Sequence, residues 1–305
     1  MKTLVFGKDG QLGKAFYQEF IAMPEVSFLG RREYDLSNIK SLVNFLHLSN
    51  PDLIINAAAY TDVDKAEENQ NDAFVINALA PKAMAYFCAQ NDKIFFHFST
   101  DYVFDGQKTM PYHEEDVCEP INVYGKSKLA GELGIQEVFS SKSNQSLGAF
   151  YIVRASWIYG DGRNFIRTIL RLAKEQTELK IVVDQVGVPT NTAWLAKVAL
   201  LMLGSNKLES GIYHVAPAGK TSRYELALYV LTCAIELKIP LALNIKNIIP
   251  VSTKKYSLSA ERPINSMLST EKITKKLPTI HFLLKDEWRV QVKQYIEYLH
   301  HHRLI

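Results

Sequence analysis

The chain has 305 residues, 47% of them hydrophobic and 22% charged, and a formal net charge of +3. This length and apolar content suit one large α/β domain, or a nucleotide-binding domain with a smaller lobe. The small charge argues against a nucleic-acid partner. Three distant cysteines without a CxxC pair are typical of a reduced protein. No signal-peptide pattern precedes the first apolar run, and no run is long enough to cross a membrane. We therefore predict a cytoplasmic protein with no membrane partner.

In the first half, short apolar runs alternate with helical patterns. The runs predict strands at 2–6, 26–29, 53–56, 94–98 and 149–154. The helical patterns begin at residue 11 and cover 38–48, 70–91 and 122–139. Such alternation is typical of βαβ units with right-handed crossovers. It predicts an α/β fold with a Rossmann-like, doubly wound parallel sheet that binds ligands at the carboxyl ends of its strands.

Beyond residue 155 the pattern changes. Helices are predicted at 164–175, 191–204 and 222–237, and short extended pieces at 180–183, 211–216 and 246–249. We interpret residues 1–155 as a cofactor-binding domain that carries the catalytic pair described below. Residues 156–305 are interpreted mainly as a smaller C-terminal α/β substrate-binding lobe, with some segments returning to the main sheet.

A glycine-rich loop follows the first predicted strand. Gly7, Gly10 and Gly13 are spaced as GxxGxxG, which differs from the GxGxxG of many dehydrogenases. Glycines between a strand and a helix let the backbone approach a diphosphate, which the helix N-terminus then binds through its free N–H groups. The alternative is a tight turn that binds no ligand. The context favours a dinucleotide site.

Two arginines, Arg31 and Arg32, follow the second predicted strand, where the adenosine ribose of a dinucleotide is expected. An acidic residue there binds the ribose hydroxyls, whereas arginine accommodates a 2′-phosphate. The pair therefore favours NADPH over NADH. The alternative is two exposed loop arginines with no cofactor contact.

The third and fourth predicted strands end in small or hydroxyl-bearing residues. Ala57, Ala58 and Ala59 leave room for a cofactor against the backbone, although close packing explains them equally well. Thr100, in the run Ser-Thr-Asp-Tyr, offers a hydroxyl to a substrate carbonyl that develops negative charge. The long segment between Thr100 and the next predicted helix allows the two to meet.

That helix carries Tyr124 and Lys128 four residues apart, so that both side chains share one face. A phenol has a pKa of about 10, which a neighbouring ammonium group lowers. Such a pair exchanges a proton near neutrality, as a carbonyl reduction requires. An incidental pair on a surface helix is the alternative.

Taken together, the motifs resemble the extended short-chain dehydrogenase/reductase family and, within it, the dTDP-4-dehydrorhamnose reductases. The matching blocks are 6–13, 56–67, 99–104, 122–132, 154–159, 184–190 and 262–266. Related dehydratases carry an Asp-Glu pair after the threonine, whereas Asp101 is followed here by Tyr102. One departure is Glu261, which stands where the reductases often carry an arginine.

The resemblance implies that NADPH, or in some members NADH, delivers hydride to C4 of a keto sugar attached to dTDP. It implies that Tyr124 protonates the nascent alkoxide, Thr100 polarises the keto group, and Lys128 binds the nicotinamide ribose. The expected cofactor contacts are Gly7, Asp9, Gly10, Gln11, Leu12, Gly13, Arg31, Asp35, Leu36, Ala57, Ala58, Ala59, Thr61, Tyr124 and Lys128. The expected substrate contacts are Thr61, Val63, Thr100, Asp101, Tyr124, Trp157 and Arg262.

Several alternatives stay open at this point. Arg262 either pairs with the substrate diphosphate or forms a structural salt bridge. The chain acts on dTDP-4-dehydrorhamnose, on another nucleotide-linked 4-keto sugar, or serves as a non-catalytic NADP-binding regulatory subunit. The resemblance also implies a homodimer and a magnesium ion in some members, but no carboxylate cluster in the sequence is identified as a metal site.

Overall fold

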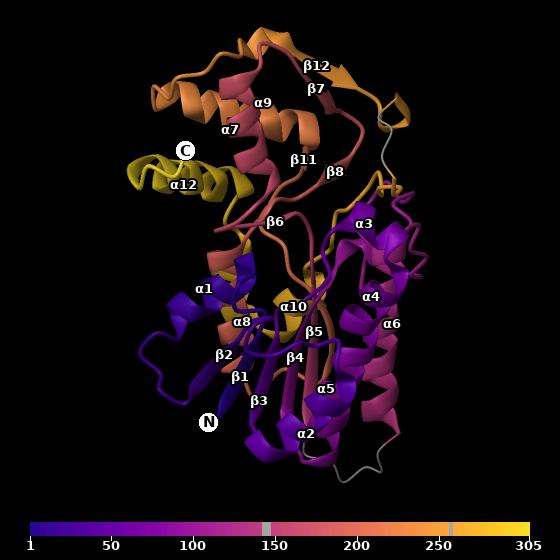
Figure 1. The fold of residues 1–305 in the computed structure, drawn as a ribbon. Helices are drawn as coiled ribbons and strands as arrows, with labels where there is room; N and C mark the ends of the chain where they lie inside the picture. Colours follow the sequence, from indigo (N-terminus) through magenta and orange to yellow (C-terminus); the bar gives the residue numbers. More distant parts are fainter. Residues whose placement is uncertain (142–147, 256–258) are drawn as a thin grey trace.

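A six-stranded parallel sheet forms the centre of the protein (Figure 1). The computed structural model describes residues 1–141, 148–255 and 259–305. The strands of this sheet are β1 (Thr3–Phe6), β2 (Val26–Leu29), β3 (Leu53–Asn56), β4 (Ile94–Thr100), β5 (Ala149–Ala155) and β10 (Gly211–His214). They lie in the order β10-β5-β4-β3-β1-β2, and all neighbouring pairs are parallel. The predicted α/β fold with a parallel sheet is confirmed.

Helices cover both faces of the sheet because its strands are apolar on both sides. On one face pack α2 (Ile39–Ser49), α5 (Ala80–Gln90) and α6 (Val123–Ser140). On the other pack α1 (Gln11–Glu19), α8 (Thr192–Leu203), α10 (Glu271–Lys276) and α11 (His281–Leu284). Successive residues of β4 alternate between them, with Phe95 in the first layer and Phe96 in the second.

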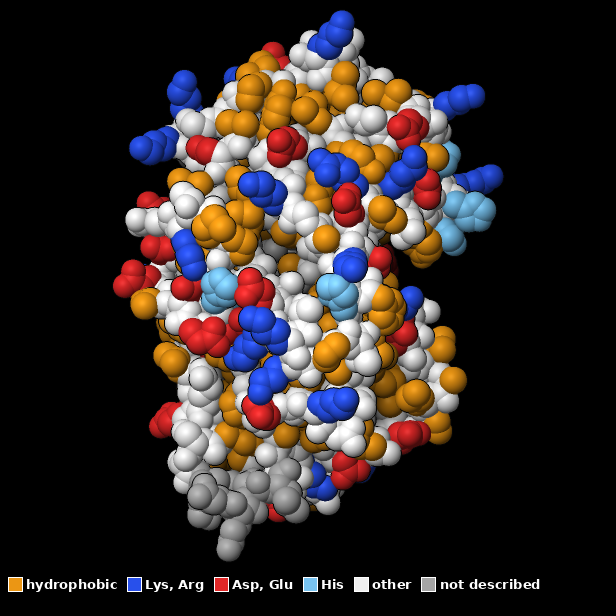
Figure 2. Space-filling model, turned by 180° about the vertical axis from the view of Figure 1, so that it is seen from behind, with side chains coloured by type: hydrophobic (Ala, Val, Ile, Leu, Met, Phe, Trp, Pro, Cys, Tyr) orange, Lys and Arg blue, Asp and Glu red, His pale blue; other side chains and the backbone are white. Residues whose placement is uncertain are grey.

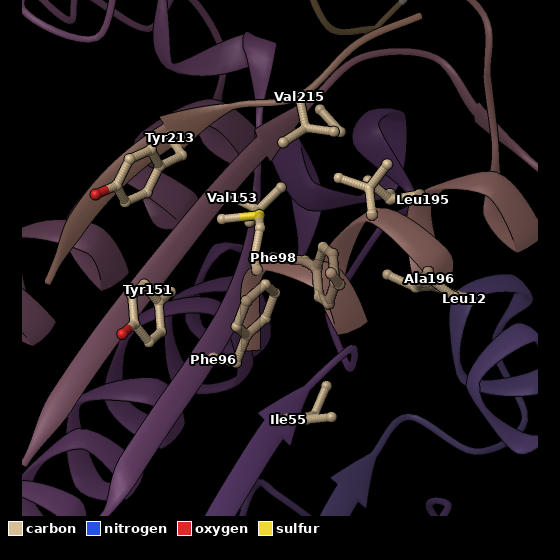
Figure 3. Packing of buried hydrophobic residues seen from close by; sticks show 14 of the residues in the cluster. Leu12, Ile55, Phe96, Phe98, Tyr151, Val153, Leu195, Ala196, Tyr213 and Val215 are labelled. Carbon is tan, nitrogen blue, oxygen red and sulfur yellow. The ribbon is translucent and has the colours of Figure 1, made fainter. Parts of the chain in front are cut away.

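The second layer shows how late segments complete the Rossmann core. Phe96 and Phe98 of β4 pack with Val153 of β5 and with Leu195 of α8 (Figure 3). Tyr213 and Val215, from β10 and the segment that follows it, extend the same cluster. Their burial removes large apolar surfaces from water and fixes residues 192–215 onto the sheet.

A second lobe lies beyond the carboxyl ends of the sheet strands (Figure 1). Its helices are α7 (Phe165–Glu175), α9 (Arg223–Glu236) and α12 (Trp288–His301). Its short strands pair two by two: β6 (Ile158–Tyr159) with β9 (Thr190–Asn191), β7 (Leu179–Val182) with β12 (Ile248–Val251), and β8 (Val186–Gly187) with β11 (Thr221–Ser222). Trp288, Ile169 and Val230 belong to a separate apolar core in this lobe.

The chain crosses between the two cores more than once. After α7 and β7 have been placed in the lobe, α8 and β10 return to the main sheet, and α9 then goes back to the lobe. A single boundary at residue 155 therefore describes the polypeptide only approximately, and the division into two domains stays a prediction.

The predicted helix at 70–91 contains an irregular turn. It consists of α4 (Gln70–Phe74), a π-helical segment at Val75–Leu79, and α5. Short π segments inside helices occur frequently at functional sites. Here the segment presents Asn77, whose side chain holds the backbone of Tyr60 through two hydrogen bonds, accepting from its N–H at 2.8 Å and donating to its carbonyl at 3.1 Å.

The surface carries charges of both signs. On the face drawn in Figure 2, basic and acidic side chains are interspersed over both lobes. Within the described residues, no helix is long and apolar enough to span a membrane. The same residues contain no group of three or more His, Cys, Asp or Glu side chains arranged to hold a metal ion.

Candidate active site

A cleft of about 850 Å³ lies between the carboxyl ends of the sheet strands and the second lobe. It is lined by residues that follow β1, β3 and β4, by the start of α6, and by Trp157 and Arg223 on the lobe side. Of the predicted cofactor and substrate contacts, all line this cleft except Gly13 and Arg262. The fold thus brings into one cavity residues that are far apart in the sequence.

The glycine loop fits the diphosphate of a dinucleotide. Gly7 has a φ of +93°, and a Cβ there would lie 2.6 Å from the Ala57 backbone. Gly13 stands behind the loop, because a Cβ at this position would lie 2.0 Å from the Gly7 carbonyl oxygen. Helix α1 begins after Gly10 without a side-chain cap, so its first N–H groups are available to an anion. These residues would hold the cofactor phosphates.

The two arginines after β2 differ in position. Arg31 lines the cleft, whereas Arg32 does not. Glu33 accepts hydrogen bonds from the Gly30 N–H at 2.9 Å and from the Lys8 ammonium at 2.7 Å. These two hydrogen bonds engage the Glu33 carboxylate. Of the two arginines, Arg31 is the one that can reach a 2′-phosphate in the cleft.

The catalytic candidates Thr100, Tyr124 and Lys128 meet in the same part of the cleft. The Thr100 hydroxyl donates to Asp101 Oδ1 at 3.1 Å, and its oxygen accepts the Tyr102 N–H at 3.2 Å. Helix α6 begins after Asn122, whose side chain accepts the Gly125 N–H at 2.7 Å and fixes the first turn. That cap places Tyr124 near Thr100, whose hydroxyl partly lowers the pKa of the phenol.

The predicted lowering of the Tyr124 pKa by Lys128 is wrong for this arrangement. Burial raises the pKa of the phenol above its usual value of 10, and this effect outweighs the lowering effect of the hydrogen bond with Thr100. Lys128 directs its ammonium to the Phe98 carbonyl at 2.6 Å. Burial lowers the Lys128 pKa to about 8, against an opposing effect of Glu132. Tyr124 is therefore held as a protonated phenol, the form that donates a proton.

A buried histidine that the sequence analysis missed lies behind Lys128. His97 Nε2 is 3.3 Å from the Lys128 nitrogen, and His97 Nδ1 is 3.1 Å from Asn56 Nδ2. The Ala58 N–H donates to Asn56 Oδ1 and so fixes the orientation of that amide. Burial holds the pKa of His97 well below its usual value, so the ring is neutral. The signal that sequence reasoning overlooked is a histidine inside an otherwise apolar strand.

Helix α6 is anchored to the sheet by a buried ion pair. Arg154 on β5 donates to Glu132 with N–O distances of 2.6 to 3.2 Å, and both side chains are almost fully excluded from solvent. Ser99 also donates to Glu132. A buried pair of this kind is costly to break because either charge would be left without compensation. The ion pair thereby also fixes the position of Lys128, which lies one helical turn before Glu132 in α6.

The substrate end of the cleft combines residues from both lobes. Val63 begins α3 (Val63–Glu68), and Thr61 precedes it. The Asp101 carboxyl is buried, with no hydrogen-bond partner at Oδ2, and burial raises its pKa to about 6. Tyr102 packs edge-on against Tyr124, with ring centroids 5.7 Å apart. Trp157 faces them from the second lobe.

Arg262 lies outside the cleft lining. Its guanidinium forms an ion pair with Asp64 at 2.7 Å and donates to the Ala260 carbonyl at 2.7 Å. This arrangement favours the structural salt bridge among the two alternatives. Arg223, which the sequence analysis did not select, lines the cleft instead. In the sequence, the only signal for Arg223 is its position at the start of a predicted helix.

A glycine loop at a helix N-terminus, together with a threonine, a tyrosine and a lysine in one cleft, defines a class of protein. These are Rossmann-type oxidoreductases that use a nicotinamide dinucleotide. Comparison with known proteins agrees. The family model of the RmlD substrate binding domain matches residues 1–301. The chain belongs to this family.

Several of the similar proteins are dTDP-4-dehydrorhamnose reductases. The dTDP-4-dehydrorhamnose reductase of Escherichia coli (strain K12) is 38% identical over 98% of both chains. A crystal structure of a dTDP-4-dehydrorhamnose reductase from Clostridium acetobutylicum has a TM-score of 0.86 and 33% identity, covering 98% of this chain and all of the other. That of the Bacillus anthracis enzyme in complex with NADP has a TM-score of 0.84 and 32% identity, with the same coverage.

Proposed function

We propose that this protein reduces the C4 keto group of dTDP-4-dehydrorhamnose to give dTDP-L-rhamnose, with NADPH as the reductant. The observation that carries the proposal is the meeting of Thr100, Tyr124 and Lys128 in a cleft whose other end is the glycine loop. Membership of the family, and relatives that are dTDP-4-dehydrorhamnose reductases, support the substrate. Arg31 in the cleft, and the NADP in the Bacillus anthracis structure, support the phosphorylated cofactor.

The side chains divide the work of the reduction. NADPH supplies the hydride when it is bound. Thr100 donates a hydrogen bond to the keto oxygen as that oxygen gains negative charge. Tyr124 then gives its proton to the oxygen, and its raised pKa keeps the phenol protonated until that moment. Lys128 binds the cofactor ribose, the role that the family resemblance implies for it.

The cleft also controls the surroundings of the reacting group. Tyr102 and Trp157 cover the substrate end with aromatic surface. Aromatic walls exclude water and strengthen each polar interaction with the keto oxygen. A homodimer and a bound magnesium ion are implied by family resemblance alone and stay predictions, as does a cytoplasmic location.

The test is a direct assay with the purified protein. NADPH is mixed with dTDP-4-dehydrorhamnose, the loss of NADPH absorbance is followed, and the product is identified by mass spectrometry. We expect dTDP-L-rhamnose, with faster turnover than for the same keto sugar linked to UDP. Equal or faster turnover of the UDP compound would identify a different nucleotide-linked sugar as the substrate. Cofactor binding without turnover of any keto sugar would favour the regulatory-subunit alternative.

A further inference from the structure

Arg223 occupies an unusual position for a cation. It is the first residue of α9, and its backbone N–H donates to the Gln185 carbonyl at 3.1 Å. The guanidinium carbon lies 3.6 Å from the centroid of the Trp157 ring and 5.0 Å from that of Phe165. In the part of the chain that the structure describes, the side chain forms no ion pair with a carboxylate. A charge that is partly removed from water and left without a counter-ion is costly.

The residue on which Arg223 stacks, Trp157, has a strained backbone conformation. Trp157 has a φ of +45°, in the left-handed region that bulky residues rarely occupy. A Cβ on Gly187 would lie 2.6 Å from Cε2 of the Trp157 ring, so that only glycine fits against the indole here. Gly187 and the Arg223 guanidinium thus both pack against the Trp157 ring. Arg223 and Trp157 both line the cleft.

Asp101 acts on Arg223 electrostatically without forming an ion pair with it. Burial has the larger effect on the pKa of both side chains and favours their neutral forms, whereas each charge favours the charged form of the other. Tyr102 lies next to Arg223, whose charge lowers the pKa of the Tyr102 phenol against the larger raising effect of burial. The Tyr102 ring in turn contacts the Tyr124 ring. Tyr124, Tyr102 and Arg223 therefore follow one another along the cleft.

This order fits the geometry of a sugar nucleotide. In a pyranose ring the C4 keto group and the anomeric oxygen stand at opposite ends. A sugar with its keto oxygen at Tyr124 would extend across Tyr102, and its anomeric phosphate would reach the region of Arg223. Guanidinium groups bind phosphate oxygens through paired, charge-assisted hydrogen bonds.

We propose that Arg223, stacked on Trp157, binds the diphosphate of the nucleotide sugar and selects a diphosphate-linked sugar over a monophosphate. The proposal rests on the proposed function for the orientation of the sugar. The proposal assigns to Arg223 the diphosphate contact that the sequence analysis considered for Arg262. The Arg262 guanidinium donates instead to Asp64 and to the Ala260 carbonyl.

The experiment uses dTDP and dTMP as probes of the anion site, with dissociation constants from isothermal titration calorimetry in the presence of NADPH. For Arg223→Gln we expect dTDP to bind about 10-fold to 100-fold more weakly, the loss typical of a charge-assisted hydrogen bond. The preference for dTDP over dTMP should shrink by a similar factor. In the reductase assay, KM for the keto sugar should rise while kcat stays within about threefold.

Matched controls separate this role from a structural one. Arg289 also stacks on a tryptophan of the same lobe, Trp288, with its guanidinium carbon 4.6 Å from the ring centroid, but it is exposed and lies outside the cleft. Arg289→Gln and Arg262→Gln should leave the dTDP affinity within about twofold of the wild type. Arg223→Lys keeps the charge but loses the planar fork, and we expect an intermediate affinity.

Wild-type dTDP affinity in Arg223→Gln overturns the proposal, as does an equal loss for dTDP and dTMP. A loss confined to Arg262→Gln would return the diphosphate contact to that residue. If circular dichroism shows that Arg223→Gln does not fold, Arg223→Lys decides, and an unchanged dTDP affinity in it has the same meaning. A wild-type protein that binds dTDP and NADPH but reduces no keto sugar refutes the proposed function while leaving the Arg223 result to stand by itself.

Discussion

The two ends of the cleft are built in different ways. At the cofactor end, the backbone makes the site: Gly7 to Gly10 form the loop before α1, and Ala57 to Ala59 form the wall beside it. Each of these segments is contiguous and follows directly after a strand. At the substrate end, side chains from separate segments make the site, with Asp101, Trp157 and Arg223 contributed by the sheet and by the second lobe.

This difference indicates which end of the cleft determines specificity. A backbone cradle accepts any dinucleotide diphosphate, since N–H groups and small residues recognise phosphate in general. The assembled end depends on the way in which the lobe sits on the sheet, and on a strained Trp157 whose ring contacts both Gly187 and Arg223. We therefore expect the cofactor end to respond to changes in volume and the substrate end to changes in charge and hydrogen bonding.

The largest expected effect is at the point where the two ends meet. Tyr124→Phe removes the proton donor, so kcat should fall by roughly 10² to 10⁴-fold. NADPH affinity should stay nearly unchanged, because the ring itself remains. Stopped-flow measurement of NADPH oxidation and fluorescence titration of NADPH test the two parts. Full activity in this variant would reject Tyr124 as the acid.

Gly13→Ala tests the volume sensitivity of the cofactor end. The added methyl group would lie 2.0 Å from the Gly7 carbonyl oxygen, so the loop must move. We expect a loss of about 3 kcal/mol in the free energy of unfolding, together with weaker NADPH binding, measured by urea denaturation and fluorescence titration. Gly134→Ala is the matched control in helix α6, where the methyl group meets only the flexible Lys82 side chain at 3.1 Å. Equal effects of both variants would show that the loop has no special need for Gly13.

Lys128→Met tests the comparison through the pH dependence of the free energy of unfolding. Burial lowers the Lys128 pKa from 10.5 to about 8. At pH values between about 8 and 10.5, Lys128 carries a proton in the unfolded chain but not in the folded chain. The free energy of unfolding therefore rises with pH over this range. The buried lysine lowers stability most at pH values below this range. Methionine removes a cost of roughly 3 kcal/mol at pH 7 but also removes the hydrogen bond to Phe98, worth about 1 kcal/mol.

The variant should therefore be more stable than the wild type by about 2 kcal/mol at pH 7, although inactive, and the gain should shrink as the pH rises toward 10.5. Urea unfolding at a series of pH values measures this. Lys126→Met, on the exposed side of the same helix, is the control and should show no such trend. A pH-independent difference between Lys128→Met and the wild type would contradict the assignment of the cost to a buried charge.

The smallest expected effect separates the two arginines after β2. Arg31→Ala should reduce the preference for NADPH over NADH by about tenfold, the loss of one charge-assisted contact to the 2′-phosphate. Arg32→Ala should leave the preference unchanged, because Arg32 does not line the cleft. The ratio of kcat/KM for the two cofactors provides the measurement. The reverse pattern would place the 2′-phosphate beside Arg32.

Much of the fold was predictable because the main strands are short, apolar and bounded by turn residues. The predicted strands 26–29 and 53–56 agree with β2 and β3 residue for residue. The return of β10 to the sheet edge was foreseen only in general terms, since pairing between residues 60 apart leaves no local signal. The π segment at Val75–Leu79 was not foreseen either, because it depends on the bonds of Asn77 to Tyr60 and Ser127.

The direction of the Tyr124 pKa shows a second limit of sequence reasoning. The spacing of Tyr124 and Lys128 correctly placed both in the cleft. It could not show that Lys128 would bond to the Phe98 carbonyl, or that burial would outweigh a nearby amine. His97 was missed for the same reason, since its neighbours Asn56 and Lys128 come from different elements.

The sequence by itself determined the parallel sheet, the glycine loop, and the presence of a threonine, a tyrosine and a lysine suited to carbonyl reduction. These features are set by strand and helix periodicity and by short motifs, in which the interacting residues are close in the chain. Only the tertiary structure decided which arginine faces the cleft and which is held by Asp64. Burial and the identity of the nearest counter-ion are properties of packed segments, and they set the charge and the reach of each side chain.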